Sequence, residues 1–173
     1  MHLGRGSALH IIAIMLSTTS TAAAQYWSVD AAAQDQQGKV SAVASVASSD
    51  ADHLRIYRSA NGEVWLSLRL RVGSEALDPS SCPTYQVQGN SSADAKIVSP
   101  CTVDDSGVRI KLGQIRNDEI ESEMLLSLMD GDTLHLTLKL TGLGYRRTTV
   151  SLRRSRQALL KVLGTNTNVV AYR

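Results

Sequence analysis

The chain has 173 residues, and its 18 Lys and Arg residues against 16 Asp and Glu residues leave a net charge of +2. This near balance excludes the strongly basic composition of a general nucleic-acid-binding protein. The length is that of one ordinary domain with its own hydrophobic core. No internal repeat indicates a second domain.

Residues 1–24 have the features of a secretory signal peptide. Arg5 supplies a positive charge, residues 8–16 form an apolar run too short to cross a bilayer, and three alanines end at Ala24. We expect cleavage after Ala24 and a periplasmic or secreted bacterial location for the 149 residues left when 24 are removed from 173. No later apolar run has membrane length. The alternative is a buried N-terminal helix, which His10 disfavours.

Short stretches of alternating hydrophobicity predict strands through most of the remaining chain. They lie at residues 27–33, 39–47, 54–59, 63–72, 84–87, 95–99, 108–112, 133–141 and 145–152. The stretch at 39–47 has a spacing nearer to that of a helix, but its valines favour a strand.

Asn61 and Gly62 mark the clearest hairpin. The pair favours positive φ at both central positions of a two-residue type I′ turn, so we expect it to join the strands on either side. The strand after the turn has an apolar face and an opposite face that includes Trp65, Arg69 and Arg71. We expect the apolar face to lie in the core.

Residues 119–129 change to a helical period. Asp118 is predicted to be the N-cap, Glu121 to complete a capping box, and Gly131 to end the helix.

Residues 155–163 predict a second helix, with Ser155 as N-cap and Gly164 as C-cap. Residues 165–173 are expected to form a loosely held tail, so the domain is predicted at 25–164. Many short strands with two helices and no β-α rhythm favour a mainly β fold. We expect a single antiparallel β-sandwich or barrel-like domain with two short helices, the last one C-terminal.

Cys82 and Cys101 are the only cysteines. In an exported protein they predict one disulfide, which closes a loop of about 20 residues and stabilises the fold by about 3 kcal/mol. A metal site is not indicated, because His53 and His135 both lie far from the cysteines in sequence. A catalytic thiol would need a base that the sequence does not identify.

No pattern identifies a catalytic group. The chain lacks a Gly-x-Ser-x-Gly turn, and His53 and His135 are expected to be solvated histidines. The carboxylates at 118–132 flank a predicted helix, which favours a role as helix-dipole complements over one as paired catalytic acids. We therefore expect no enzyme activity, no cofactor and no bound metal.

Charge is segregated in the C-terminal half. Residues 104–132 contain eight acids, whereas residues 142–173 contain seven basic residues and no acid. One interpretation is a patch that faces an anionic envelope component or an acidic partner protein. The alternative is that the charges of the two helices compensate each other. The predicted patch residues are Arg146, Arg147, Arg153, Arg154, Arg156 and Lys161.

Several segments occur in an order that resembles a known family. Trp27 opens the expected mature chain, residues 125–138 (LLSLMDGDTLHLTL) resemble a helix, Gly turn and strand, and Ser151-Leu152 and Ala158-Leu159 keep the spacing of a closing segment. In this order they resemble the invasion-associated locus B family of bacterial envelope proteins, although Arg154-Ser155 replaces a Gly-Phe pair. The resemblance implies an exported, disulfide-containing, β-rich protein and supplies no catalytic residue.

These features favour a non-enzymatic envelope module that binds a partner or supports assembly, with no nucleic-acid partner. Two alternatives stay open. One is a small envelope hydrolase whose catalytic residues the sequence does not identify, and the other is an inhibitor of a periplasmic enzyme.

Overall fold

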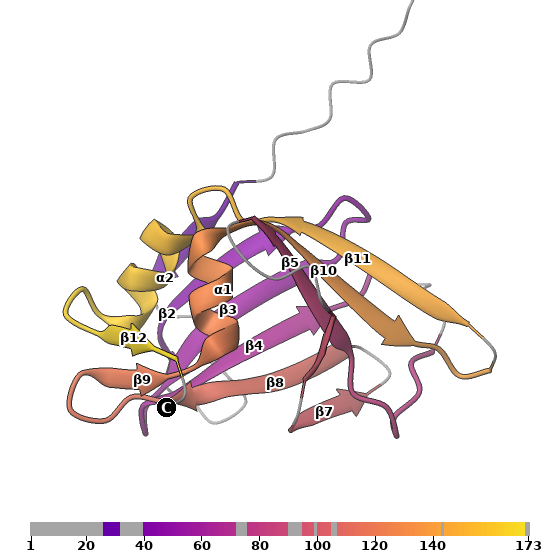
Figure 1. Ribbon diagram of the computed structural model, residues 1–173, viewed down its shortest axis with the longest axis horizontal. Helices are drawn as coiled ribbons and strands as arrows, with labels where there is room; N and C mark the ends of the chain where they lie inside the picture. Colours follow the sequence, from indigo (N-terminus) through magenta and orange to yellow (C-terminus); the bar gives the residue numbers. More distant parts are fainter. Residues whose placement is uncertain are drawn as a thin grey trace, which may run out of the picture.

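The computed structural model describes residues 26–31, 40–71, 76–89, 95–98, 100–104, 107–142 and 144–171, which form a mainly β domain with two short helices (Figure 1). The strands are β1 (Ser28–Ala31), β2 (Val40–Ala47), β3 (His53–Ser59), β4 (Glu63–Arg69), β5 (Thr84–Gly89), β6 (Lys96–Ile97), β7 (Cys101–Asp104), β8 (Gly107–Gln114), β9 (Glu119–Glu121), β10 (Gly131–Lys139), β11 (Tyr145–Ser151) and β12 (Asn168–Val170). The helices are α1 (Glu123–Asp130) and α2 (Ser155–Leu163). The predicted fold class is confirmed.

Two antiparallel sheets form the layers of the domain. The larger sheet has the strand order β1-β2-β3-β4-β8-β7, and the smaller has the order β11-β10-β5-β6. The two helices lie beside the smaller sheet on the same side of the larger one, where α2 contacts β1, β2 and β3 (Figure 1). The arrangement is therefore sandwich-like, with β1 and β7 at opposite edges of the six-stranded sheet.

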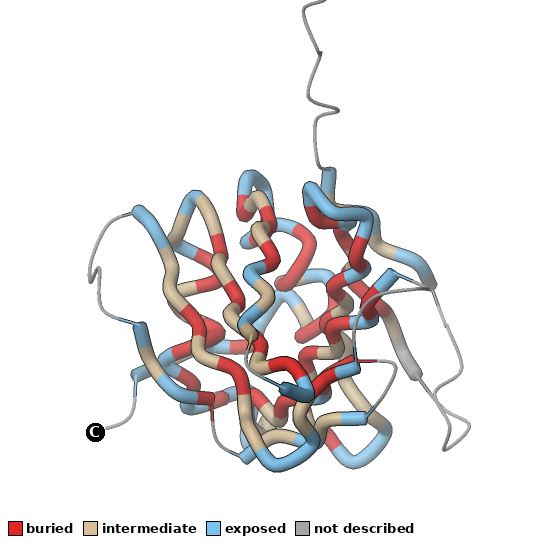
Figure 2. Tube along the Cα trace, turned by 90° about the vertical axis from the view of Figure 1, so that its right-hand side faces the viewer, coloured by how far each residue is buried: buried red, intermediate tan, exposed pale blue. Residues whose placement is uncertain are grey.

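The core forms because each strand presents every second residue to the space between the layers. Leu54 and Ile56 on β3, Leu66 on β4, and Leu134 and Leu136 on β10 are almost completely buried. Figure 2 shows this alternation of buried and more exposed positions along the chain. Each such side chain contributes about 1.5–3 kcal/mol when it leaves water. Shifting the pairing of two strands by one residue would turn all the apolar side chains of one strand toward solvent. The burial of these side chains therefore sets the strand register.

The predicted hairpin at Asn61 and Gly62 is confirmed, but its turn is not type I′. Only Gly62 has a positive φ, +83°, and its N–H donates to the Ser59 carbonyl at 3.0 Å. The Asn61 side chain accepts a hydrogen bond from the Glu63 N–H at 3.2 Å. The connection is therefore one residue longer than predicted, with glycine at the left-handed position that such loops require.

The first helix begins later than predicted. Asn117 and Asp118 have φ angles of 49° and 60° and form the type I′ turn of a small hairpin, so Asp118 is not an N-cap. The strand β9 follows, and α1 starts only after Ser122, whose Oγ accepts from the Leu125 N–H at 3.2 Å. Asn and Asp enter left-handed conformations readily, which is why the same residues suit a turn as well as a cap. The predicted end at Gly131 is confirmed.

The second helix has the predicted limits, but Ser155 does not cap it. Its Oγ donates to the Leu128 carbonyl of α1 at 2.6 Å, and the N-cap is Arg154, with a φ of 67°. Gly164 ends the helix as predicted, at a φ of 109°. The two helices are thus joined by a buried hydrogen bond.

The residues expected as a loosely held tail include a strand. β12 pairs in parallel with β9, and Val169 lies opposite Ile120. The predicted signal peptide at residues 1–24 and its cleavage site lie outside the described residues. None of the helices among the described residues has the length and apolar character needed to cross a bilayer.

Candidate functional site

The predicted disulfide is confirmed and connects the two sheets. Cys82 lies in the loop before β5 of the smaller sheet, and Cys101 begins β7 at the edge of the larger one, with 5.7 Å between their Cα atoms. The bond therefore fastens an edge strand that no other strand pairs with on its outer side among the described residues.

Arg146, the first residue of the predicted basic patch, points toward the core. Its Nη2 donates to the two carboxylate oxygens of Asp52 at 2.7 and 2.8 Å. Asp52 is fully buried, and it also accepts from the Thr148 hydroxyl at 2.8 Å and from the Arg71 N–H at 2.8 Å. A buried charge needs such partners, because it has lost its hydration. Arg146 is thus part of the link between the sheets.

Arg156 is also engaged. It forms an ion pair with Asp130 at the end of α1, where both side chains are about half exposed. This contact favours the interpretation that the charges of the two helices compensate each other, at least for this pair. An exposed ion pair of this kind contributes little to stability, about 0–1 kcal/mol.

The other predicted patch residues are exposed but lie in two places. Arg153 and Arg154 form the turn before α2, and Lys161 lies in the last turn of that helix. Arg147 lies on the outer face of the smaller sheet, because its neighbours Arg146 and Thr148 face inward. The structure therefore does not bring the six predicted residues together on one face.

The two histidines lie apart. His53 is exposed at the start of β3, whereas His135 is half-buried on β10 and its Nδ1 lies 3.0 Å from the Thr149 hydroxyl. Its Nε2 is buried without a hydrogen-bond partner among the described residues. Burial, followed by the nearby Arg147 guanidinium, lowers the pKa of His135. The imidazole is therefore neutral at about pH 7.

No described group of three or more His, Cys, Asp or Glu side chains has the arrangement needed to hold a metal ion.

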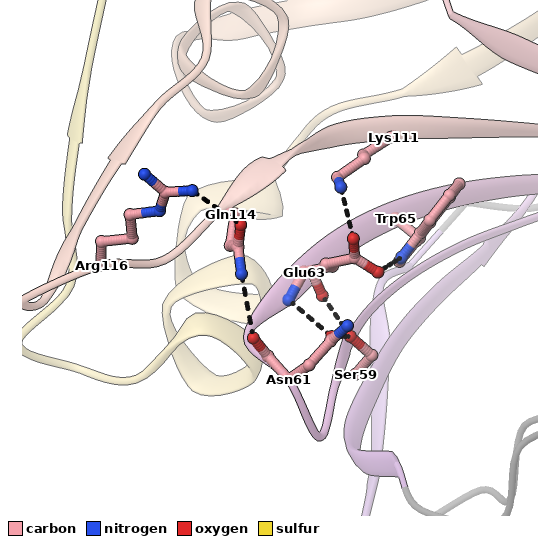
Figure 3. A network of polar contacts seen from close by, with 7 residues as sticks. All are labelled: Ser59, Asn61, Glu63, Trp65, Lys111, Gln114 and Arg116. Atoms are coloured by element: carbon pink, nitrogen blue, oxygen red, sulfur yellow. Dashed lines mark hydrogen bonds and ion pairs between the residues drawn. The ribbon is translucent and has the colours of Figure 1, made fainter.

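A second set of basic side chains lies on the outer face of the six-stranded sheet, outside the patch predicted from the sequence. Figure 3 shows one edge of this face, where Lys111 forms an ion pair with Glu63 and the Trp65 indole N–H donates to the same carboxylate at 3.3 Å. The bond from Lys111, followed by that from Asn61, lowers the pKa of Glu63. The sequence signal for these side chains is the alternation of Arg69 with apolar residues along β4.

Comparisons with known proteins give a similarity to solved structures. No protein-family model matches the chain, and no curated protein sequence is similar to it. Among solved structures, the chain is similar to the crystal structure of invasion associated protein B from Bartonella henselae, with 17% identity, coverage of 82% of this chain and 94% of that chain, and a TM-score of 0.48. The name of this solved structure matches the family that the sequence resembles, and a similarity at this identity and TM-score says nothing about activity.

Proposed function

We propose that this chain is an exported bacterial envelope protein that acts as a binding or assembly module without a catalytic centre. The observation that carries the proposal is the Cys82–Cys101 disulfide between the two sheets. Disulfides persist in oxidising compartments such as the periplasm and are rare in reducing cytosol. The features of residues 1–24 favour export independently.

The way the polar side chains are used supports a role other than catalysis. Asp52, Arg146 and Thr148 bond to one another within the fold. His135 contacts Thr149 and lacks a bond to a described carboxylate, which would orient the imidazole of a catalytic triad. The polar groups with the most elaborate hydrogen bonding therefore stabilise the structure.

Export is tested by expressing the full chain in a bacterium, blocking free thiols before lysis, and measuring the mass of the product in each cell fraction. The expected result is a periplasmic protein that begins at Gln25 and has no blocked thiol. A cytoplasmic product with two blocked thiols would refute export.

Binding is tested by crosslinking the purified protein to isolated envelope and identifying the captured partners. The variant Arg153→Glu/Arg154→Glu asks whether the turn before α2 takes part, with Arg116→Glu on the β8–β9 turn as the control for charge reversal. Release of envelope fragments by the wild type but not by His135→Ala would refute the non-catalytic role and favour the hydrolase alternative.

A further inference from the structure

One residue from each strand of the six-stranded sheet contributes to a row across its outer face. The strand register pairs neighbouring members of this row directly, from β1 to β7. The members of this outer row are Ser28, Ser45, Arg55, Ser67, Arg109 and Thr102. Directly paired residues lie on the same face of a sheet, and none of the six is buried. At about 4.8 Å per strand, the outer row spans about 24 Å.

Every side chain of the outer row can donate hydrogen bonds, and none is acidic. The Ser28 and Ser45 hydroxyls lie 2.8 Å apart and bond to each other. Arg55 and Arg109 lie on either side of Ser67, about 10 Å apart in backbone position. Neither arginine has an ion pair with a described residue. Arg69, two residues along β4 from Ser67, adds an exposed positive charge on the same face.

The carboxylates of this face leave the outer row positive. Glu63 is paired with Lys111 (Figure 3), and Asp104 accepts the Gly107 N–H at 3.0 Å in the turn between β7 and β8. Asp30 lies on the edge strand β1, two strands from Arg55 and four strands from Arg109. A face whose guanidinium groups have no ion pair with a described residue, and whose nearest carboxylates are engaged, attracts an anion.

The shape and chemistry of the face restrict the kind of anion. Insertion into a lipid surface and tight protein contacts commonly use protruding apolar side chains, and the large exposed hydrophobic residues Tyr26, Ile97 and Tyr145 all lie outside the strands of this sheet. A single-stranded nucleic acid stacks its bases on open aromatic faces, whereas the Trp65 ring has the Lys111 Nζ at 5.9 Å from its centroid.

We propose that the outer row binds a linear acidic polysaccharide built from uronic acids. Guanidinium groups form paired hydrogen bonds with carboxylates, and the serine and threonine hydroxyls match the hydroxyls of the sugars between charged groups. The proposal names a partner class for the exported module and so rests on the proposed function above.

The test measures binding of the purified, oxidised protein to alginate, a linear polymer of uronic acids, by titration calorimetry. Alginate is expected to bind, and neutral dextran is not. The variant Arg55→Gln/Arg109→Gln should bind at least about tenfold more weakly, since each lost charge-assisted hydrogen bond is of that size or larger. Added salt should weaken wild-type binding.

The matched control, Arg153→Gln/Arg154→Gln, removes the same charge from the turn before α2 and should change affinity by less than about twofold, as expected for groups outside the contact. Ser67→Asp places a carboxylate between Arg55 and Arg109 without removing either, and should also weaken binding. This second variant keeps the test decisive if the double variant melts at a lower temperature than the wild type.

The proposal would be overturned if alginate did not bind, or if Ser67→Asp bound alginate as tightly as the wild type. It would also be overturned if the α2 control lost as much affinity as the Arg55→Gln/Arg109→Gln variant. Tight binding of phosphatidylglycerol vesicles or single-stranded DNA in place of alginate would overturn it too. Captured envelope partners combined with no alginate binding would refute this proposal alone and leave the proposed function standing.

Discussion

Asp52 and Arg146 join the two sheets through an ion pair in which the carboxylate is fully buried, with N–O distances of 2.7 and 2.8 Å. Asp52 precedes β3 of the larger sheet, and Arg146 lies on β11 of the smaller one. The cost of burying the carboxylate is offset only while the guanidinium and the Thr148 hydroxyl remain in place.

Arg146→Met is therefore expected to lower the free energy of unfolding by about 3 kcal/mol, because it leaves a buried carboxylate without its counter-charge. Urea denaturation measures the loss. Arg147→Met is the control, since the neighbouring side chain is exposed on the opposite face, and it should change stability by about 0.5 kcal/mol or less. Similar losses of unfolding free energy in the two variants would contradict the stabilising role of the buried ion pair.

Removing the disulfide should destabilise the fold without changing its topology. Cys82→Ser/Cys101→Ser is expected to lower the free energy of unfolding by about 3 kcal/mol, because the unfolded chain regains the freedom of a closed loop. Reductant should shift the urea midpoint of the wild type to that of the variant and leave the variant unchanged. A wild-type midpoint that does not respond to complete reduction would contradict this expectation.

The start of α1 can be tested by comparing Ser122, which is the observed N-cap, with Asp118, which is the predicted one. Ser122→Ala should cost about 1 kcal/mol, because the Leu125 N–H loses its acceptor. Asp118→Gly should cost little, since glycine accepts the left-handed backbone found there. A larger loss of thermal stability for Asp118→Gly than for Ser122→Ala would indicate that the helix begins at Asp118 in solution.

The longer strands and the disulfide are predictable because each depends on a short-range signal. The alternation of apolar and polar residues along a strand, as from Leu134 to Leu138, predicts which face of that strand is buried, and it does not depend on which strand lies next to it. Cys82 and Cys101 have only each other as disulfide partners. Local rules therefore settle these features.

The remaining features depend on contacts between residues far apart in the chain. Arg146 and Asp52 are separated by 94 positions, so no local pattern indicates that this arginine faces inward. The outer row likewise depends on the pairing of β4 with β8, which the sequence does not specify. The wrong start of α1 has a local cause, because Asp118 suits both a cap and a turn.

Asp78 and Lys139 provide a pH-dependent test of the segment before Cys82. The Lys139 Nζ lies 2.8 Å from one oxygen of the Asp78 carboxylate, and the Ser80 hydroxyl and N–H donate to the other at 2.6 and 2.9 Å. The bond from Lys139, followed by those from Ser80, holds the pKa of Asp78 well below its usual range and raises the pKa of Lys139.

Because the folded state lowers the Asp78 pKa, its stabilisation is present above the unfolded value of about 3.9 and is lost as pH falls toward the folded value. Asp78→Asn should therefore lower the urea midpoint relative to the wild type at about pH 7, and the difference should narrow as pH falls below about 4. Lys139→Met removes the other partner and should show the same trend in acid. A difference between Asp78→Asn and the wild type that stays constant from about pH 7 to about pH 2 would contradict a stabilising role for the ionised pair.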